Sequence, residues 1–280
     1  MKQRKMLTFS GQTLSYLFLL AVIIFAIFPA LWMFVTSIKP HSEILTTPPR
    51  WITHHPTLSS YSRVLFHSSI PRAFLNSVVV TVCTTILTLF FSILAGYGFS
   101  RYKFRGSRTL STGLLFGQMM PGVAIVIPLY MALNKVHLID SYAALVIANM
   151  AITIPLGVIM LRSFFQSVPR ELEEAAKIDG TTNLGALFRI ILPVSAPGII
   201  AVSVYTFLNS WEEFLFALNF TNSASVQTLP IAVNEFSGEF VIDWGGMMSA
   251  SVVVSIPVLV VFLACSKYFV KGLADGSVKG

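Results

Sequence analysis

The chain has 280 residues, of which 55% are hydrophobic and only 11% are charged. This composition lies outside the range of soluble globular domains and predicts an all-α membrane protein. The formal net charge of +7 does not favour nucleic-acid binding, because no basic face is interleaved with exposed aromatic residues. We expect the charge to follow membrane topology and contacts with anionic lipid.

Apolar runs long enough to cross about 30 Å of hydrocarbon recur along the chain. Six such runs cover residues 14–36, 74–99, 110–133, 142–161, 197–220 and 246–269. Transmembrane β-strands are excluded, because they are about half this length and alternate in polarity. We therefore expect one transmembrane domain over residues 1–280, with six helices and both chain ends on the same side.

Positive charge sets the expected orientation. Most of the 19 Lys and Arg residues fall before the first run, in the second and fourth loops, and near the tail over residues 270–280. By the positive-inside rule, these segments and both termini are expected in the cytoplasm. The first run lacks a small-residue cleavage pattern, so we expect a retained anchor rather than a cleaved signal.

The fourth loop, residues 167–193, interrupts the apolar pattern with a charged, glycine-containing segment. Ser167 is the expected N-cap of a helix over residues 169–178, and Gly180 is its expected C-terminal stop. A second short helix is expected to begin near residues 181–183 and to end before Pro193. It should turn three apolar side chains inward, Leu184, Leu187 and Phe188.

The first of these helices has a narrow face of small and apolar side chains. Leu172, Ala175 and Ala176 are three and four residues apart, and alanine lets another backbone approach closely. The residues alone leave two interpretations open. The helix pair either docks onto another protein or rests on the membrane surface as an ordinary amphipathic loop.

The fifth run carries the only acidic residues within a predicted span, Glu212 and Glu213. On one continuous helix, polar side chains would form two adjacent stripes beside Trp211. The first stripe has Thr206, Asn209, Ser210 and Glu213, and the second includes Tyr205 and Glu212. Hydroxyl, amide and carboxylate groups beside aromatic rings suit a sugar pathway, while packing against a partner subunit or closing a gate remains the alternative.

Two other classes of function compete for the same acidic pair. Costly carboxylates within a membrane are typical of ion-coupled secondary transporters, where Glu212 and Glu213 would act as a relay. An intramembrane enzyme is disfavoured, because adjacent residues on a helix point about 100° apart and no Ser/His or metal constellation accompanies them. We therefore assign no catalytic residue and no metal site. The chain also has no phosphate-binding loop, so it cannot supply energy from ATP alone.

The fourth loop carries a specific motif. Glu174-Ala175-Ala176, followed by Gly180, Ile190 and Leu192-Pro193 at fixed spacing, resembles the EAA loop of ABC importer membrane subunits. The likeness extends over nearly the whole chain and is strongest to carbohydrate-type permeases similar to the smaller membrane subunit of the maltose transporter. It includes the segments FLNS, GYGFSRYKFRG, MMPGVAIVIPLY, LIDS and KGLADGSVKG.

This resemblance implies a type I ABC importer permease fold, with a cytoplasmic coupling helix between helices four and five. The ATPase-coupling residues would be Glu174, Ala175, Ala176, Asp179, Gly180, Ile190, Leu192 and Pro193. The implied partners are a homologous second permease, two ATPase subunits and an extracytoplasmic solute-binding protein, besides membrane lipid. The chain would bind no cofactor, since ATP and Mg would reside on the ATPase subunits. It would be a non-catalytic subunit that passes a sugar or oligosaccharide across the bacterial cytoplasmic membrane.

Overall fold

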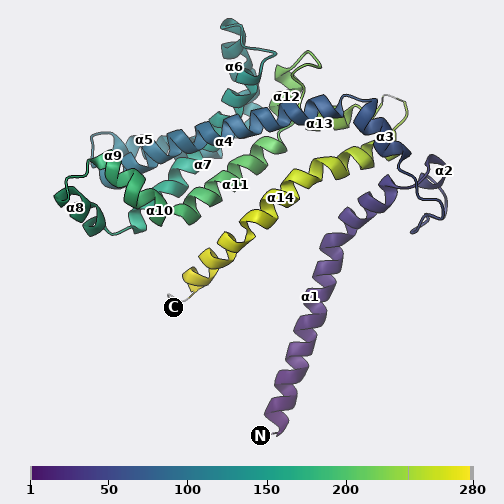
Figure 1. Cartoon of the computed structure of the whole chain (residues 1–280), viewed down its shortest axis with the longest axis horizontal. Helices are drawn as coiled ribbons and strands as arrows, with labels where there is room; N and C mark the ends of the chain where they lie inside the picture. The colour runs from purple at the N-terminus through teal and green to yellow at the C-terminus, as the bar shows by residue number, and fades with distance from the viewer. Residues whose placement is uncertain (1, 239, 278–280) are drawn as a thin grey trace. The chain divides into compact units, whose positions relative to one another are not determined.

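The computed structural model describes residues 2–238 and 240–277 (Figure 1), with side chains described for residues 14–238 and 240–266. Within that part the secondary structure is helical, apart from one isolated antiparallel bridge between Ser237 and Ile242. The all-α prediction is therefore confirmed for the described residues. Of the predicted tail over residues 270–280, the backbone is helical through Ser277, and residues 278–280 lie outside the described part.

The chain divides into two compact units. The first comprises Met1–Ser68 and Val233–Val254, and the second comprises Ser69–Ala232 and Ser255–Gly280. Helix α14 (Trp244–Ser277) begins in the first unit and continues into the second. The single transmembrane domain expected over residues 1–280 stays a prediction.

The first unit contains α1 (Lys2–Ser37), α2 (His41–Ile44) and α3 (Ser59–Phe66), together with the first turns of α14. Two contacts hold these segments together. Arg63 forms an ion pair with Asp243 at 2.7 Å, and the Ser249 hydroxyl donates to the carbonyl of Ser37 at 3.2 Å.

A buried lysine fixes the long loop that follows α1. The Lys39 ammonium lies 4.3 Å from the centre of the Trp32 ring and donates to the carbonyl of Arg50 at 2.6 Å. Burial lowers the pKa of Lys39 from its ordinary value, and the nearby Glu43 carboxylate opposes that shift. The loop is thus tied back to the end of α1 by a desolvated cation.

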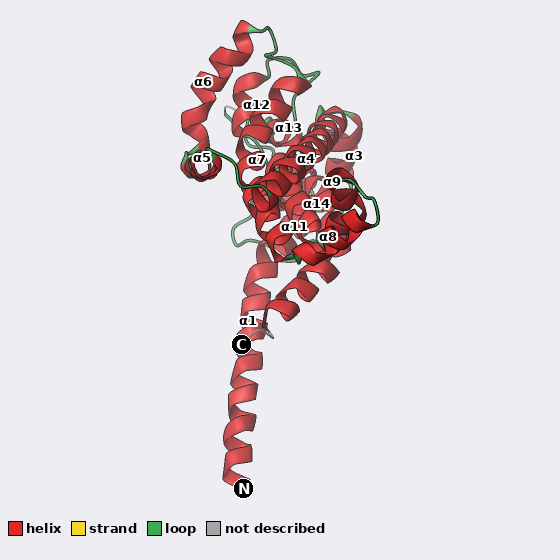
Figure 2. Ribbon diagram, turned by 90° about the vertical axis from the view of Figure 1, so that its left-hand side faces the viewer, coloured by secondary structure: helices red, strands yellow, loops and turns green. Residues whose placement is uncertain are grey.

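Three helices form the centre of the second unit: α4 (Ile70–Arg101), α7 (Tyr142–Ser167) and α11 (Ala196–Trp211). They lie side by side in both ribbon views (Figures 1 and 2). Small residues allow this close packing, because a Cβ atom on Gly96 of α4 would lie only 3.1 Å from the backbone nitrogen of Arg162 on α7. A buried hydrogen bond of 2.8 Å between Thr88 and Thr153 also joins α4 to α7.

The third predicted span, residues 110–133, is not one straight helix. The structure has α5 (Ser107–Met119) and α6 (Gly122–Lys135), which meet at an angle of 106°. The break falls at Met120 and Pro121, where the proline ring disfavours helical backbone in the residue before it. The chain therefore turns sharply between two helices here and does not bend within one helix.

The fifth predicted span, residues 197–220, is also interrupted. Helix α11 ends at Trp211 and α12 (Leu215–Phe220) begins four residues later, so the expectation of one continuous helix is wrong. A further helix, α13 (Leu229–Asn234), follows α12. Among the described residues, four helices are long and apolar enough to cross a membrane, or up to six if each of two bent helix pairs counts as one span.

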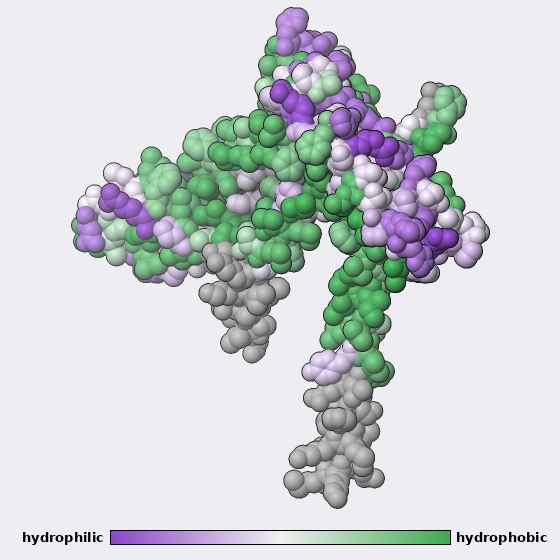
Figure 3. Space-filling model, turned by 45° about the vertical axis from the view of Figure 1, so that its right-hand side comes forward, coloured by the Kyte–Doolittle hydropathy of each residue, from purple (hydrophilic) through white to green (hydrophobic). Residues whose placement is uncertain are grey.

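The long helices of the second unit expose apolar side chains outward. Figure 3 shows hydrophobic residues along these helices and hydrophilic residues gathered at their ends. Exposed large side chains include Leu75, Ile86, Phe90, Phe116 and Ile127. Exposed apolar surface on this scale is typical of a helix surface that meets lipid or other membrane helices.

Candidate functional site

The loop between α7 and α11 folds as a chain of short helices. It contains α8 (Arg170–Ile178), α9 (Asn183–Ala186), the π-helical turn η1 (Leu187–Ile191) and α10 (Leu192–Val194). The predicted pair of helices is therefore confirmed, with the first helix bounded almost as expected. Its predicted end before Pro193 is wrong, because the helix continues to Val194 and the chain bends by 80° before α11.

Local sequence explains the turn between α8 and α9. Gly180 has a φ of +82°, a left-handed conformation that favours glycine. The N–H of Thr181 donates to the carbonyl of Ala176, and the N–H of Gly180 donates to that of Lys177, each at 3.0 Å. These two bonds form a Schellman motif, which satisfies the last carbonyls of α8. Gly180 is thus the C-terminal stop that the sequence predicts.

The N-terminal caps differ in part from the prediction. Ser167 is the last residue of α7, and its hydroxyl donates to the carbonyl of Phe164 at 2.7 Å, so it does not cap α8. Pro169 is the residue that precedes α8, since a proline needs no backbone donor bond there. The Thr182 hydroxyl accepts from the N–H of Gly185 at 3.1 Å and caps α9.

A buried ion pair anchors α8 to the end of α4. The Glu173 carboxylate pairs with the Arg101 guanidinium, and their side chains are only 6% and 7% exposed. The Tyr97 hydroxyl donates to the other Glu173 oxygen at 3.0 Å, and Arg101 also donates to the carbonyl of Val168 at 3.0 Å. The charges of Arg101 and Glu173 are thus paired and hydrogen-bonded, as burial requires.

The sequence does not predict this anchor. Glu173 lies in the first turn of α8, where the helix dipole alone favours an acidic side chain, whereas the structure buries it. The two partners are 72 residues apart in the chain, so no local pattern connects them. The available signal was an acidic side chain on the same helical face as Ala176, which is also buried.

The opposite face of the loop is apolar and exposed. Ile178 is 87% exposed and Phe188 is 59% exposed, and Leu172 and Leu184 are also exposed. The prediction that Leu184 and Phe188 turn inward is wrong. Only Leu187 does so, because the ridge of Leu187 and Ile191 packs against the core formed by Tyr97, Leu161, Phe165 and Val202.

The predicted coupling residues fall on both faces of this loop. Glu174, Ala175, Asp179, Gly180 and Pro193 are exposed, Ile190 and Leu192 are half-buried, and Ala176 is buried. The exposed members share their surface with the apolar side chains of Leu172 and Ile178. An exposed apolar and acidic helix face, fixed from behind by an ion pair, can bind another protein.

The break between α11 and α12 changes the predicted polar stripes. Glu213 lies between the two helices, and its carboxylate accepts from the N–H groups of Phe216 at 2.6 Å and Ala217 at 3.0 Å. These N–H groups open α12 and would otherwise have no partner. Glu213 is therefore a helix cap and does not continue the stripe of α11.

The remaining pathway candidates do not share one surface. Thr206, Ser210 and Trp211 are buried, and Trp211 stacks on Phe207 with ring centres 5.6 Å apart. Asn209 and Glu212 are exposed, and Tyr205 is half-buried. The structure thus separates the seven candidates into buried packing residues, one cap and a small exposed set.

A second cluster ties the loop over residues 221–228 to the opposite end of α4. The Asn76 amide donates to the carbonyls of Ser225 at 3.0 Å and Gln227 at 2.7 Å, and the Tyr142 hydroxyl donates to Asn76 at 2.7 Å. Asp140 accepts from the N–H groups of Ser223 and Asn222. Asn76 and Asp140 lie within the segments FLNS and LIDS, whose sequence alone does not predict these contacts.

Backbone donors tune the Asp140 carboxylate. The N–H of Ser223 lies 3.0 Å from one Asp140 oxygen, and that of Asn222 lies 2.8 Å from the same atom. The bond from Ser223 and then that from Asn222 lower the pKa of Asp140 from its ordinary value, and burial opposes them. The charged form of Asp140 therefore stabilises this loop.

The described residues contain no group of three or more His, Cys, Asp or Glu side chains that could hold a metal ion. Cys83 and Cys265 are both free thiols. The two acidic residues at the α11 end, Glu212 and Glu213, point to different tasks, because one is exposed and the other caps α12. Glu213 caps a helix, and the exposed carboxylate of Glu212 can bind another molecule.

Residues 88–275 match the family described as the binding-protein-dependent transport system inner membrane component. The chain is similar to the sulfoquinovosyl glycerol transport system permease protein SmoH of Agrobacterium fabrum, at 33% identity over 97% of this chain and 95% of that protein. It is also similar to the trehalose/maltose transport system permease protein MalG of Thermococcus litoralis, at 35% identity over 92% of this chain and 93% of that protein.

A solved structure shares the fold. One chain of a bacterial ABC transporter that imports the acidic polysaccharide alginate superposes with a TM-score of 0.81, at 20% identity over 92% of this chain and 95% of that chain. At this level of identity the match concerns the fold alone.

The buried ion pair generates the first prediction. We expect Glu173→Gln to leave the Arg101 guanidinium buried without a counter-charge, which typically costs about 3–5 kcal/mol. Thermal unfolding of the purified protein should show a clearly lower midpoint. Glu171→Gln is the matched control, because Glu171 lies exposed on the same helix and its replacement should shift the midpoint little. Equal midpoints for the two variants would contradict the anchor.

The Asp140 contacts generate a pH-dependent prediction. Because the folded pKa is depressed, the stabilisation is present above the unfolded pKa of about 3.9 and is lost as pH falls through the folded pKa. Asp140→Asn should lower stability at pH 7 by about 1 kcal/mol. The difference in unfolding midpoint from wild type should vanish at acid pH. A pH-independent difference, or a change as large for Asp179→Asn in the exposed α8–α9 turn, would count against this assignment.

Proposed function

Since the chain belongs to the family of binding-protein-dependent inner-membrane transport components, we propose that it forms half of the translocation pathway for a sugar or oligosaccharide. The chain is a permease subunit of an ABC importer, has the type I importer permease fold, and is a multi-pass protein of the inner membrane. Permease subunits of this kind are non-catalytic. The sugar assignment is supported by relatives named for sulfoquinovosyl glycerol and for trehalose and maltose.

The observation that carries the mechanism is the two-sided loop between α7 and α11. Its outer face exposes Ile178 and Phe188, while its inner face is held by the buried pair of Glu173 and Arg101. We assign the outer face to a groove on an ATPase subunit, where Glu174, Ala175 and Gly180 of the EAA motif would lie. Closure of the ATPases would then displace α8, and the ion pair would pass that displacement to α4.

The proposed assembly contains this chain, a homologous second permease, two ATPase subunits and an extracytoplasmic solute-binding protein. ATP and Mg would be bound by the ATPase subunits. We propose six crossings, in which α5 with α6 and α11 with α12 each form one, and cytoplasmic positions for both termini. This arrangement places the loop that contains α8 on the cytoplasmic side, where the ATPases bind.

The exposed residues at the end of α11 are the proposed substrate contacts of this subunit. Asn209 and Glu212 offer an amide and a carboxylate, and the half-buried Tyr205 offers a ring and a hydroxyl. Thr206, Ser210 and Trp211 would support this surface from the buried side. The rival ion relay is weakened, because both Glu213 oxygens already accept from backbone N–H groups.

Purification of the tagged full chain from its native membrane tests the assembly. Mass spectrometry should identify an ATPase and a second permease with the wild-type chain. Ile178→Glu should lower ATPase recovery by about tenfold, because it places a charge in an apolar contact. The control is Val136→Glu, since Val136 is also exposed but lies outside the α8 loop. Recovery of a stable chain without partners would overturn the ABC assembly. A co-purifying binding protein should bind a sugar.

The turn at Gly180 generates a prediction about coupling. Gly180→Val should leave the chain in the membrane but uncouple sugar uptake from ATP hydrolysis, because valine does not tolerate the left-handed backbone. Uptake and ATPase rates in reconstituted vesicles measure the ratio directly. Gly180→Asn is the matched control and should retain most coupling, because asparagine adopts this conformation more readily. Normal coupling in the valine variant would remove Gly180 from the mechanism.

A further inference from the structure

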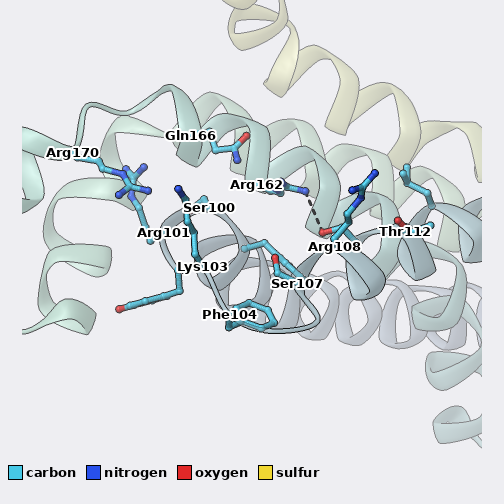
Figure 4. Close-up of a pocket in the computed structure, with 14 residues that line it drawn as sticks. Ser100, Arg101, Lys103, Phe104, Ser107, Arg108, Thr112, Arg162, Gln166 and Arg170 are labelled. Carbon is cyan, nitrogen blue, oxygen red and sulfur yellow. Dashed lines mark hydrogen bonds between the residues drawn. The ribbon is translucent and has the colours of Figure 1, made fainter.

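A basic cavity lies in the second unit, where the C-terminal ends of α4 and α7 meet the start of α5 (Figure 4). Its volume is about 540 Å³. Five cationic side chains line it, Arg101, Lys103, Arg108, Arg162 and Arg170. None of the described residues that line it is acidic. The cavity therefore concentrates positive charge with no carboxylate inside it.

The five cationic side chains of the cavity differ in whether an acidic side chain lies near them. Arg101 is paired with Glu173, and Arg170 borders a neighbouring depression that Glu173 and Glu174 line. Lys103, Arg108 and Arg162 form no ion pair within the part of the chain that the structure describes. These three side chains are available to an anion from outside the chain.

Arg162 is held in place but incompletely satisfied. Its guanidinium donates to the Ser111 hydroxyl at 3.2 Å, which fixes its direction on the wall of the cavity (Figure 4). Its Nε atom is buried and has no hydrogen-bond partner. A buried donor without an acceptor is costly, and the guanidinium fork suits the oxygens of a phosphate group. Arg162 thus lines the cavity in a fixed direction, with a guanidinium group that suits a phosphate.

An apolar cavity of about 80 Å³ adjoins the basic one and shares Phe99, Ser111, Leu115 and Arg162 with it. Its remaining lining residues are all apolar, Leu114, Val158 and Ile159. A charged cavity beside an apolar one between α5 and α7 fits an amphipathic molecule. A small soluble phosphate compound would leave the apolar part unfilled.

We propose that these two adjacent cavities bind one anionic glycerophospholipid. Its phosphate would lie against Lys103, Arg108 and Arg162, and the first methylenes of an acyl chain would enter the part lined by Leu114. Basic pockets between membrane helices on the cytoplasmic side bind anionic headgroups in this way. Because Arg101 lines the same cavity and pairs with Glu173, the lipid would sit directly beside the anchor of α8.

Native mass spectrometry of the full chain in its purified complex tests this site. The complex is titrated in detergent with dioleoylphosphatidylglycerol or, separately, with dioleoylphosphatidylcholine. We expect retention of the anionic lipid alone. Lys103→Gln with Arg108→Gln should weaken its retention by about tenfold or more, because each cation near a lipid headgroup adds to binding. Arg105→Gln is the control and should change nothing, since Arg105 belongs to the same basic loop but does not line the cavity.

Two further measurements distinguish a bound lipid from a bound soluble phosphate compound. Glycerol 3-phosphate, which carries the phosphate without acyl chains, should compete poorly with the lipid. Leu114→Phe fills the apolar part and should weaken lipid retention while all cations remain. Equal retention of the two lipids, or no loss in the double variant, would overturn the site. Full competition by glycerol 3-phosphate would overturn the lipid and identify a soluble phosphate ligand.

Discussion

The ion pair between Glu173 and Arg101 is the contact on which the functional loop depends. Two charges are taken out of water at the junction of α8 and α4, and the Tyr97 hydroxyl completes the coordination of the carboxylate. Such a pair is costly to form and more costly to break, so it favours one position of α8 rather than a range of positions. With its inner face fixed, the helix can expose Ile178 without collapsing onto the core. The exposed apolar face of α8 is thus supported by the buried charge behind it.

The same constraint governs the breaks in the apolar helices. A helix that stops within hydrocarbon leaves backbone donors and acceptors that no water can satisfy. Polar side chains meet this need at two places: Glu213 accepts from two N–H groups at the start of α12, and Asn76 donates to the carbonyls of Ser225 and Gln227 in the loop after α12. Hydrogen bonds to the backbone therefore explain Glu213 and Asn76 without a role in transport. A transport role needs a side chain that stays exposed, as Glu212 does.

How far the sequence predicts this molecule depends on the distance between interacting residues. Gly180 supplies the left-handed backbone of the turn between α8 and α9, and Thr182 bonds to a residue only three positions away. This turn therefore follows from the local sequence. The break after Trp211 does not, because no glycine or proline marks it and the cap at Glu213 acts only once the helix has stopped. The Arg101–Glu173 pair spans 72 residues and the Asn76–Ser225 bond spans 149. Contacts of that range depend on how the helices pack.

Helix α4 contacts one loop at each of its two ends. Arg101 at its C-terminal end holds α8, and Asn76 near its N-terminal end holds the loop that contains Ser225. The helical rise places these two residues about 38 Å apart along one helix. Between them, α4 packs closely on α7 through Gly96 and the Thr88–Thr153 bond, so it cannot easily bend there. A displacement of α8 is therefore not absorbed beside the ion pair. In the proposed mechanism it would move α4 together with α7, and the loop at the far end would move with them.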